Sequence, residues 1–341
     1  MAPGLIAEVS ADSLELPIRK ISKAASPEPL KLTGALNDFK YEDSTPVIGR
    51  EYLDLNIVDD LLNAANSDEL LRELAIISWF SLPNRSFTLS TCRISTNYST
   101  AVSRRGVVFF RAQDNLTDGL QKQFVHRLGQ LAGKPETSTL HIHPVLNNTA
   151  EFSVPDAEIS TISSLARKKM FRFEREGDRR RYDAADWHSD IQFEPVPADY
   201  TSLRLTELPT TGGDTLWASG YEIYDRFSRP YRKFFEGLTA TFIGDGFIKA
   251  AEANPDKVKI YEDPRGSPLN IGRELSAVHP VVRTNPVTGW KSIFAIGPFP
   301  KYINELNSLE SEQLLKKFRS IITENHDLQV RFKWRNKNDI G

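Results

Sequence analysis

The stretch Trp187-His188-Ser189-Asp190 carries the most informative pattern in this chain for both its fold and its chemistry. In an extended segment, side chains two residues apart point to the same face, so His188 and Asp190 can reach one metal ion together. A neutral imidazole and a carboxylate are two of the three protein ligands in the triad that holds non-haem Fe(II). The alternative is a loop histidine beside a surface aspartate, because an isolated His-x-Asp pair arises by chance in many proteins.

The composition indicates an ordinary globular protein. The 341 residues are 40% hydrophobic and 26% charged, which is enough for a sizeable core. A formal net charge of -2 gives no basic field for nucleic acid, and no apolar run reaches the roughly 20 residues that span a bilayer. The single Cys92 excludes an internal disulfide and is typical of a reducing compartment. The N-terminus lacks a secretory signal pattern. We therefore expect a cytoplasmic protein that binds neither nucleic acid nor a membrane, and a homo-oligomer is left open.

The chain is expected to divide into an N-terminal arm and one large domain. Residues 1–45 show no sustained hydrophobic period, so we expect a poorly ordered arm followed by a single domain over residues 46–341. Within that domain, residues 78–103 contain 11 Ser or Thr among 26 residues and have neither helical nor clean strand periodicity. A structureless connection of this length counts against a simple assignment. The segment is either a surface insertion loop or foreign to the fold, for example a translated intron.

Local patterns predict amphipathic helices that alternate with short strands. Ser67 and Thr117 are expected N-caps, because their hydroxyl groups can accept a hydrogen bond from a free amide of the first helical turn. Pro230 is expected to break a helical stretch into two pieces. The remaining expectations are strands at 202–208, 215–219 and 329–334, a hairpin of 279–283 with 292–296, and helices within 61–77, 116–131, 221–238 and 309–324.

Other histidines compete for functional roles. His141 and His143 stand two residues apart on an extended stretch, and by chemistry alone they are equally well read as metal ligands, substrate-facing residues or structural residues. His279 is the obvious candidate for a third metal ligand, but Pro280 beside it favours a structural position at a strand edge. His326 is expected at a helix end, where a cation satisfies terminal carbonyl groups.

Six stretches, one of which contains His188 and Asp190, have a recognisable sequence and follow one another over most of 104–339. They are RRGVVFFRAQ (104–113), LHIHPV (140–145), DWHSD (186–190), ELPTTGGDTLWASG (207–220), HPVVRTNPVTG (279–289) and HDLQVRFKWRNKND (326–339). With these stretches in this order, the chain resembles the TauD/TfdA family of Fe(II)/2-oxoglutarate-dependent dioxygenases, particularly its sulfonate dioxygenase-like branch.

The resemblance implies both a fold and a reaction. The fold is α+β and mainly β, a double-stranded β-helix or cupin-like jelly roll with flanking helices. The resemblance implies that His188 and Asp190 bind iron and that Thr215 contacts the carboxylate of 2-oxoglutarate. It also implies that His143 and Phe299 face the substrate, a small acidic molecule and in this branch a sulfonate. With Fe(II) as cofactor and 2-oxoglutarate and O2 as cosubstrates, the family hydroxylates a C–H bond and releases succinate and CO2.

The chain also departs from the family pattern. The family's third iron ligand is a His in a W-D-N-x-x-x-x-H stretch that begins just after the segment ending here at Asp339, and an Arg that pairs with 2-oxoglutarate follows it. Because the chain stops at Gly341, we expect the last core strands and both residues to be missing and the activity to be impaired. Leu146 and Ala184 replace a Tyr and an Asn of the taurine enzymes, which argues against taurine as the substrate. The alternative is a non-catalytic binding protein on a degenerate jelly roll.

Overall fold

The computed structural model describes residues 28–77, 105–149, 153–163, 187–256 and 258–341. The expectations for residues 1–27, for the Ser/Thr-rich segment 78–103 and for Ala184 lie outside the described residues. No helix in the described ranges combines the length and the apolar character needed to cross a bilayer.

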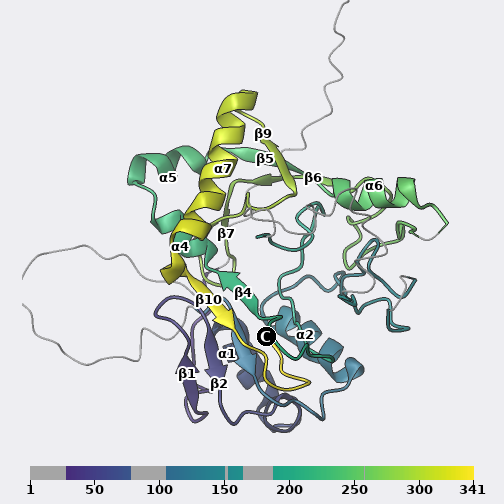
Figure 1. Cartoon of the computed structure of the whole chain (residues 1–341). Coiled ribbons are helices and arrows are strands. Elements are labelled where there is room, and N and C mark those ends of the chain that lie inside the picture. Colours follow the sequence, from purple (N-terminus) through teal and green to yellow (C-terminus); the bar gives the residue numbers. More distant parts are fainter. Residues whose placement is uncertain (1–27, 78–104, 150–152, 164–186, 257) are drawn as a thin grey trace, which may run out of the picture.

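The described elements are short strands and longer helices (Figure 1). In chain order they are β1 (Tyr41–Asp43), β2 (Arg50–Tyr52), the π-helix η1 (Ile57–Leu62), α1 (Ser67–Ile77), β3 (Val108–Phe110), α2 (Asp118–Leu131), β4 (Thr215–Ala218), α4 (Gly220–Asp225), α5 (Arg229–Phe235), β5 (Thr239–Ile243), α6 (Asp245–Ala253), β6 (Ser276–Pro280), β7 (Val282–Thr284), β8 (Lys291–Ile293), β9 (Pro300–Ile303), α7 (Ser308–Glu324), the 3-10 turn η5 (His326–Leu328) and β10 (Gln329–Phe332).

One part of the molecule is built on the sheet β1-β2-β3, against which α1 and α2 pack. Strand β2 pairs antiparallel with β1 and parallel with β3. The apolar positions of α1 recur every three or four residues, so one face of the helix is buried. Strand β1 and the buried Leu36 lie inside the expected N-terminal arm. The expectation of a poorly ordered arm over 1–45 is therefore wrong for residues 28–45, because their apolar side chains join this core.

A second part is built on the sheet β6-β5-β9 and the hairpin β7-β8. Helix α7 packs across this part and contributes Leu315, Phe318 and Ile322 to its core (Figure 1). The hairpin confirms the pairing expected from its two strands around a turn. The helical stretch 221–238 is divided into α4 and α5, with Pro230 in the first turn of α5, where its missing amide costs no hydrogen bond.

The two parts are joined by the antiparallel pair β4-β10 (Figure 1). Phe332 of β10 stacks on Phe109 of the first part, with ring centroids 3.9 Å apart. Near the chain end, Ile340 forms isolated bridges with Phe110 and Arg204. The expected strand at 202–208 is reduced to the bridge between Arg204 and Ile340. The backbone hydrogen bonds of this segment are made by Leu203 and Leu205 with residues 338–341.

The α+β expectation agrees with the described helices and several small sheets. The expectation of a mainly β protein does not, because the described strands are three to five residues long whereas α7 alone has 17 residues. The absence of the last jelly-roll strands stays a prediction.

Helix capping was expected at Ser67 and Thr117. Thr117 caps α2 by accepting a hydrogen bond from the Leu120 amide, whereas Ser67 is the first residue of α1 and donates to the Leu61 carbonyl.

Candidate functional site

His188 and Asp190 lie side by side on an irregular segment that leads into a turn. His188 Nε2 is 3.2 Å from Asp190 Oδ1, and both side chains are about half exposed to solvent. The hydrogen bond with His188 lowers the pKa of Asp190 against the opposing effect of burial, so the carboxylate is ionised at neutral pH. The sequence predicted an extended segment here, but the structure shows none. A turn begins at Asp190, and Ile191 has a left-handed φ of 46°. The predicted adjacency of the two side chains is nevertheless present.

Gly297 forms the support behind His188. Its φ is +109°, and a Cβ at this position would lie 2.9 Å from His188 Cβ and 2.9 Å from the Trp187 carbonyl oxygen. A glycine is therefore required here by both the backbone conformation and the close approach of the two segments. Gly297 also leads the chain toward Phe299, two residues later, which places the expected substrate-facing aromatic beside the His-x-Asp segment.

Aromatic rings connect the two expected iron ligands to the expected substrate residues. The Phe299 ring lies edge-on to the His188 ring, with 6.3 Å between centroids, and contacts Phe193 at 5.1 Å. Phe247 from α6 lies 6.3 Å from Phe299 and 4.7 Å from His143. The structure therefore brings His188, Asp190, Phe299 and His143 into one neighbourhood, although they come from three separate parts of the chain.

His143 is held in one protonation state and one orientation. Its Nδ1 accepts hydrogen bonds from the amides of Val145, at 3.0 Å, and Leu146, at 2.9 Å. Burial, together with the nearby His141, lowers the pKa of His143 to about 3. A neutral ring whose Nδ1 accepts must carry its proton on Nε2, so His143 presents one N–H donor.

Thr215 begins β4, and its hydroxyl oxygen accepts a 2.9 Å hydrogen bond from the indole Nε1–H of Trp334. Thr215 is half-buried, and it pairs with Phe332 of β10 in the antiparallel register of the two strands. The hydroxyl keeps its own proton as a donor, so it can still reach a carboxylate. The expected contact of Thr215 with 2-oxoglutarate stays a prediction.

The candidates for a third metal ligand occupy structural positions. His279, on β6, is buried between Phe242 and Phe294, and its Nε2 is 2.9 Å from the Glu194 carbonyl oxygen. His326 starts the short turn η5 after α7. Across the described ranges, no group of three or more His, Cys, Asp or Glu side chains could hold a metal ion. The imidazole and carboxylate of His188 and Asp190 fit Fe(II) chemically, but they supply two of the three protein donors that the family uses.

Three neighbours of the site were missed by the sequence analysis. Phe247 lies on a helix that had not been expected, and Glu194 is a buried carboxylate four residues after Asp190. Arg265, also fully buried, pairs with Glu194. The only sequence signal for these residues was the glycine that follows Arg265, because a lone glycine in a polar stretch often marks a close backbone approach. The partners of Glu194 are more than 50 residues away and could not be assigned from spacing.

A histidine and a carboxylate side by side, next to aromatic rings and a neutral histidine donor, are features of a metal-dependent oxygenase site. Residues 93–340 match the family described as "Taurine catabolism dioxygenase TauD, TfdA family". The chain therefore belongs to the TauD/TfdA family, an oxidoreductase family of 2-oxoglutarate-dependent dioxygenases that use O2.

Individual relatives agree with this assignment. The chain is 45% identical to "Alpha-ketoglutarate-dependent dioxygenase btcD" from Neocamarosporium betae, over 92% of this chain and 85% of that protein. It is 31% identical to the "Alpha-ketoglutarate-dependent sulfonate dioxygenase" of Saccharomyces cerevisiae, over 68% of this chain and 50% of that protein. A crystal structure of a taurine dioxygenase from Burkholderia xenovorans matches with a TM-score of 0.54 at 20% identity, over 89% of this chain and 78% of that chain. That likeness establishes the shared fold.

Proposed function

We propose that this protein is an Fe(II)- and 2-oxoglutarate-dependent dioxygenase that hydroxylates a small organic acid, with a sulfonate as the favoured class. The observation that carries the proposal is the pairing of His188 with Asp190 at 3.2 Å, with the ring of Phe299 against His188. The sulfonate assignment is supported by the name of the yeast relative and by the donor geometry of His143.

His188 and Asp190 would hold the iron. When bound, the iron with 2-oxoglutarate and O2 supplies the oxidising power for C–H hydroxylation. The ionised Asp190 contributes a negative charge that an Fe(II) ion needs, and Gly297 keeps the His188 backbone in place.

His143 would bind the acidic group of the substrate. An anionic oxygen needs hydrogen-bond donors, and the Nε2–H of a neutral imidazole donates without a charge that changes with pH near neutrality. Phe247 and Phe299 would pack against the apolar part of the substrate and keep water away from the reacting carbon. Thr215 would donate its hydroxyl proton to the carboxylate of 2-oxoglutarate.

We expect low turnover in this chain, because the described residues provide two protein donors for iron where the family uses three. Purified protein should be incubated with Fe(II), 2-oxoglutarate, O2 and matched series of alkyl sulfonates and carboxylates, and succinate should be measured. Succinate formation that depends on an acidic substrate supports the proposal. His188→Ala and Asp190→Ala should abolish it, whereas His326→Ala, at a helix end away from these rings, should not.

The second candidate function is a non-catalytic binding protein. It is favoured by the absence of a group of three metal donors in the described part of the chain. In that case, 2-oxoglutarate or a sulfonate would bind in a calorimetric titration, but no succinate would form above a control without protein. Vigorous, sustained turnover would instead contradict the expectation of impairment.

A further inference from the structure

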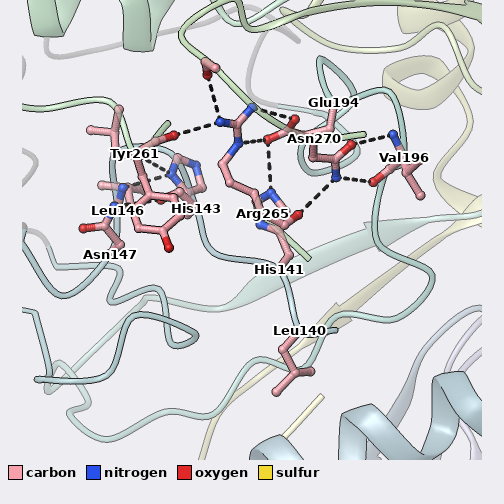
Figure 2. Close-up of polar contacts among 12 residues, drawn as sticks. Leu140, His141, His143, Leu146, Asn147, Glu194, Val196, Tyr261, Arg265 and Asn270 are labelled. Carbon is pink, nitrogen blue, oxygen red and sulfur yellow. Dashed lines mark hydrogen bonds and ion pairs between the residues drawn. The ribbon is translucent and has the colours of Figure 1, made fainter. Parts of the chain in front are cut away.

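Glu194 is a fully buried carboxylate with two partners from distant parts of the chain (Figure 2). Both of its oxygens pair with Arg265, with Nε to Oε1 at 2.5 Å and Nη2 to Oε2 at 3.0 Å. Oε1 also lies 3.3 Å from Nε2 of His141. Burial alone would raise the pKa of Glu194, but hydrogen bonds from His141 and Arg265 outweigh it and lower that pKa. The ionised Glu194 therefore connects the residues after Asp190 to the His141–His143 stretch.

Arg265 is itself fixed on its other side (Figure 2). Its Nη1 donates to the carbonyl oxygens of Tyr261 and Gly272, at 2.8 and 2.9 Å. The next residue, Gly266, has a φ of +75°, and a Cβ there would lie 2.8 Å from His141 Cα. The Gly266 carbonyl accepts a 2.8 Å hydrogen bond from the Thr139 amide. The Arg265 loop is therefore pressed directly against the backbone that carries His141.

The other end of this network reaches the iron-ligand segment. The Glu194 amide donates to the Ile191 carbonyl, which closes the turn that begins at Asp190. The Glu194 carbonyl oxygen lies 2.9 Å from Nε2 of His279. One residue, Glu194, thus belongs by its backbone to the Asp190 turn and by its side chain to the His141 stretch.

We propose that the Glu194–Arg265 pair is a positioning unit that sets the distance and orientation of His143 relative to the His188–Asp190 pair. The proposal rests on the proposed function, because His143 is taken as the residue that binds the acidic group of the substrate. Neither Glu194 nor Arg265 needs to touch the substrate or iron. They act through His141, which stands two residues before His143 on the same irregular stretch.

A pair of charges is suited to this task because of its directionality. Apolar packing holds a strand against a loop but tolerates small shifts, whereas a bidentate guanidinium–carboxylate pair fixes both distance and angle. Small errors matter at a reacting centre, where a misplacement of about 1 Å can cost about 100-fold in rate.

The first test uses neither metal nor substrate. Protein labelled with ¹⁵N at its six histidines is examined by NMR, and the His141 and His143 signals are assigned with His141→Gln and His143→Gln. The wild type should show His143 as a single neutral tautomer with the proton on Nε2. The variants are Glu194→Gln and the double variant Glu194→Gln/Arg265→Met, which removes both charges and so avoids leaving one buried charge unpaired.

The matched control is Asp339→Asn, which also removes a fully buried carboxylate from an arginine, Arg111, away from this stretch. In the Glu194 variants the His143 signal should shift or split between positions while keeping the Nε2–H tautomer that the Val145 and Leu146 amides fix. In Asp339→Asn it should match the wild type. A double variant that is folded and keeps the wild-type His143 signal would overturn the proposal. The same holds if the control shifts His143 equally, because the effect would then be one of general stability.

The second test separates this inference from the proposed function. Mn(II) is titrated as a redox-inert substitute for iron, and ethanesulfonate is titrated against the His143 Nε2 signal. The Glu194 variants should weaken ethanesulfonate binding by about tenfold and leave the Mn(II) affinity within about twofold of wild type. A wild type that binds ethanesulfonate but forms no succinate would contradict the proposed function and leave the positioning result standing. Equal loss of Mn(II) and ethanesulfonate binding would contradict the positioning role.

Discussion

The indole Nε1–H of Trp334 donates a 2.9 Å hydrogen bond to Oγ1 of Thr215. This bond connects the first residue of β4 to the segment that follows β10, and it leaves the proton of the Thr215 hydroxyl free to be donated to a carboxylate. Thr215 therefore has both a structural partner and a predicted role toward 2-oxoglutarate. The two roles can be separated by changing each end of the bond.

Thr215→Val removes the hydroxyl with little change in volume. We expect the affinity for 2-oxoglutarate to fall several-fold and the free energy of unfolding to fall by about 1–3 kcal/mol, because the Trp334 N–H loses its acceptor. Trp334→Phe breaks the same bond from the other end and should lower the stability while leaving 2-oxoglutarate affinity nearly unchanged. Calorimetric titration and urea unfolding measure the two quantities. Equal loss of 2-oxoglutarate affinity in both variants would assign Thr215 a structural role alone.

Gly297→Ala should disturb His188. The added Cβ would meet His188 Cβ and the Trp187 carbonyl at 2.9 Å on a backbone with φ of +109°. We expect weaker Mn(II) binding and a loss of stability above 1 kcal/mol, because both strain and steric overlap oppose the substitution. Gly133→Ala is the control, since Gly133 has φ of +95° with no atom within 4 Å of its Cβ. It should cost about 1 kcal/mol for the backbone conformation and leave Mn(II) binding intact.

Phe299→Leu should affect the proposed substrate pocket. The Phe299 ring contacts His188, Phe193 and Phe247, so a smaller aliphatic side chain leaves a gap beside the His-x-Asp pair. We expect binding of ethanesulfonate or a longer alkyl sulfonate to weaken several-fold, with the loss increasing with alkyl length. Phe227→Leu, in the aromatic cluster with Phe235, should lower the thermal midpoint without changing sulfonate affinity. The prediction fails if alkyl length makes no difference.

Asp339 should make stability depend on pH. Burial alone would raise the pKa of Asp339, but hydrogen bonds from backbone amides and from Arg111 lower it below its ordinary value of 3.8. A carboxyl whose folded-state pKa is depressed stabilises the fold fully above its unfolded-state pKa and loses that contribution as pH falls through the folded-state pKa. The contribution of Asp339 should therefore be complete at neutral pH, begin to fall below about pH 4 and disappear only below the depressed folded-state pKa.

Asp339→Asn should lower the free energy of unfolding at pH 7 by on the order of 3 kcal/mol, because it leaves Arg111 with Glu51 as its one remaining carboxylate partner among the described residues. The difference from wild type should shrink as urea unfolding is repeated toward pH 3. Asp54→Asn is the control, because the Asp54–Lys40 pair is largely exposed and contributes little. A difference that stays constant from pH 7 to pH 3 would argue against a depressed pKa at Asp339.

Local sequence patterns determined several elements because the forces that set them act within a few residues. The Thr117 hydroxyl reaches an amide three residues away, and Pro230 prevents one continuous helix wherever the segment is placed in the fold. The exact caps were less predictable. The helix expected at 309–324 begins at Ser308, because Asn307 caps it and the side chains of Asn307 and Glu310 form a reciprocal pair with the backbone at the helix start.

Strands β5 and β9 were missed for the opposite reason. Each is four or five residues long, and each becomes a strand by pairing with a segment far along the chain. Such pairing depends on the shape of the folded chain and leaves little trace in local periodicity. The segment 202–208 is the opposite case. Its alternating pattern predicted a strand, but in the fold it forms only an isolated bridge, between Arg204 and Ile340.

By itself the sequence determined the adjacency of His188 and Asp190, because two residues separated by one cannot be far apart in any conformation, and it determined the family through six collinear stretches. Only the tertiary structure decided what surrounds that pair. Phe247 and Arg265 come from segments more than 50 residues after Asp190, and the fold brings Phe247 against His143 and Arg265 against Glu194. The chemistry of the candidate iron ligands is thus local, whereas the positioning of His143 beside them is a property of the whole fold.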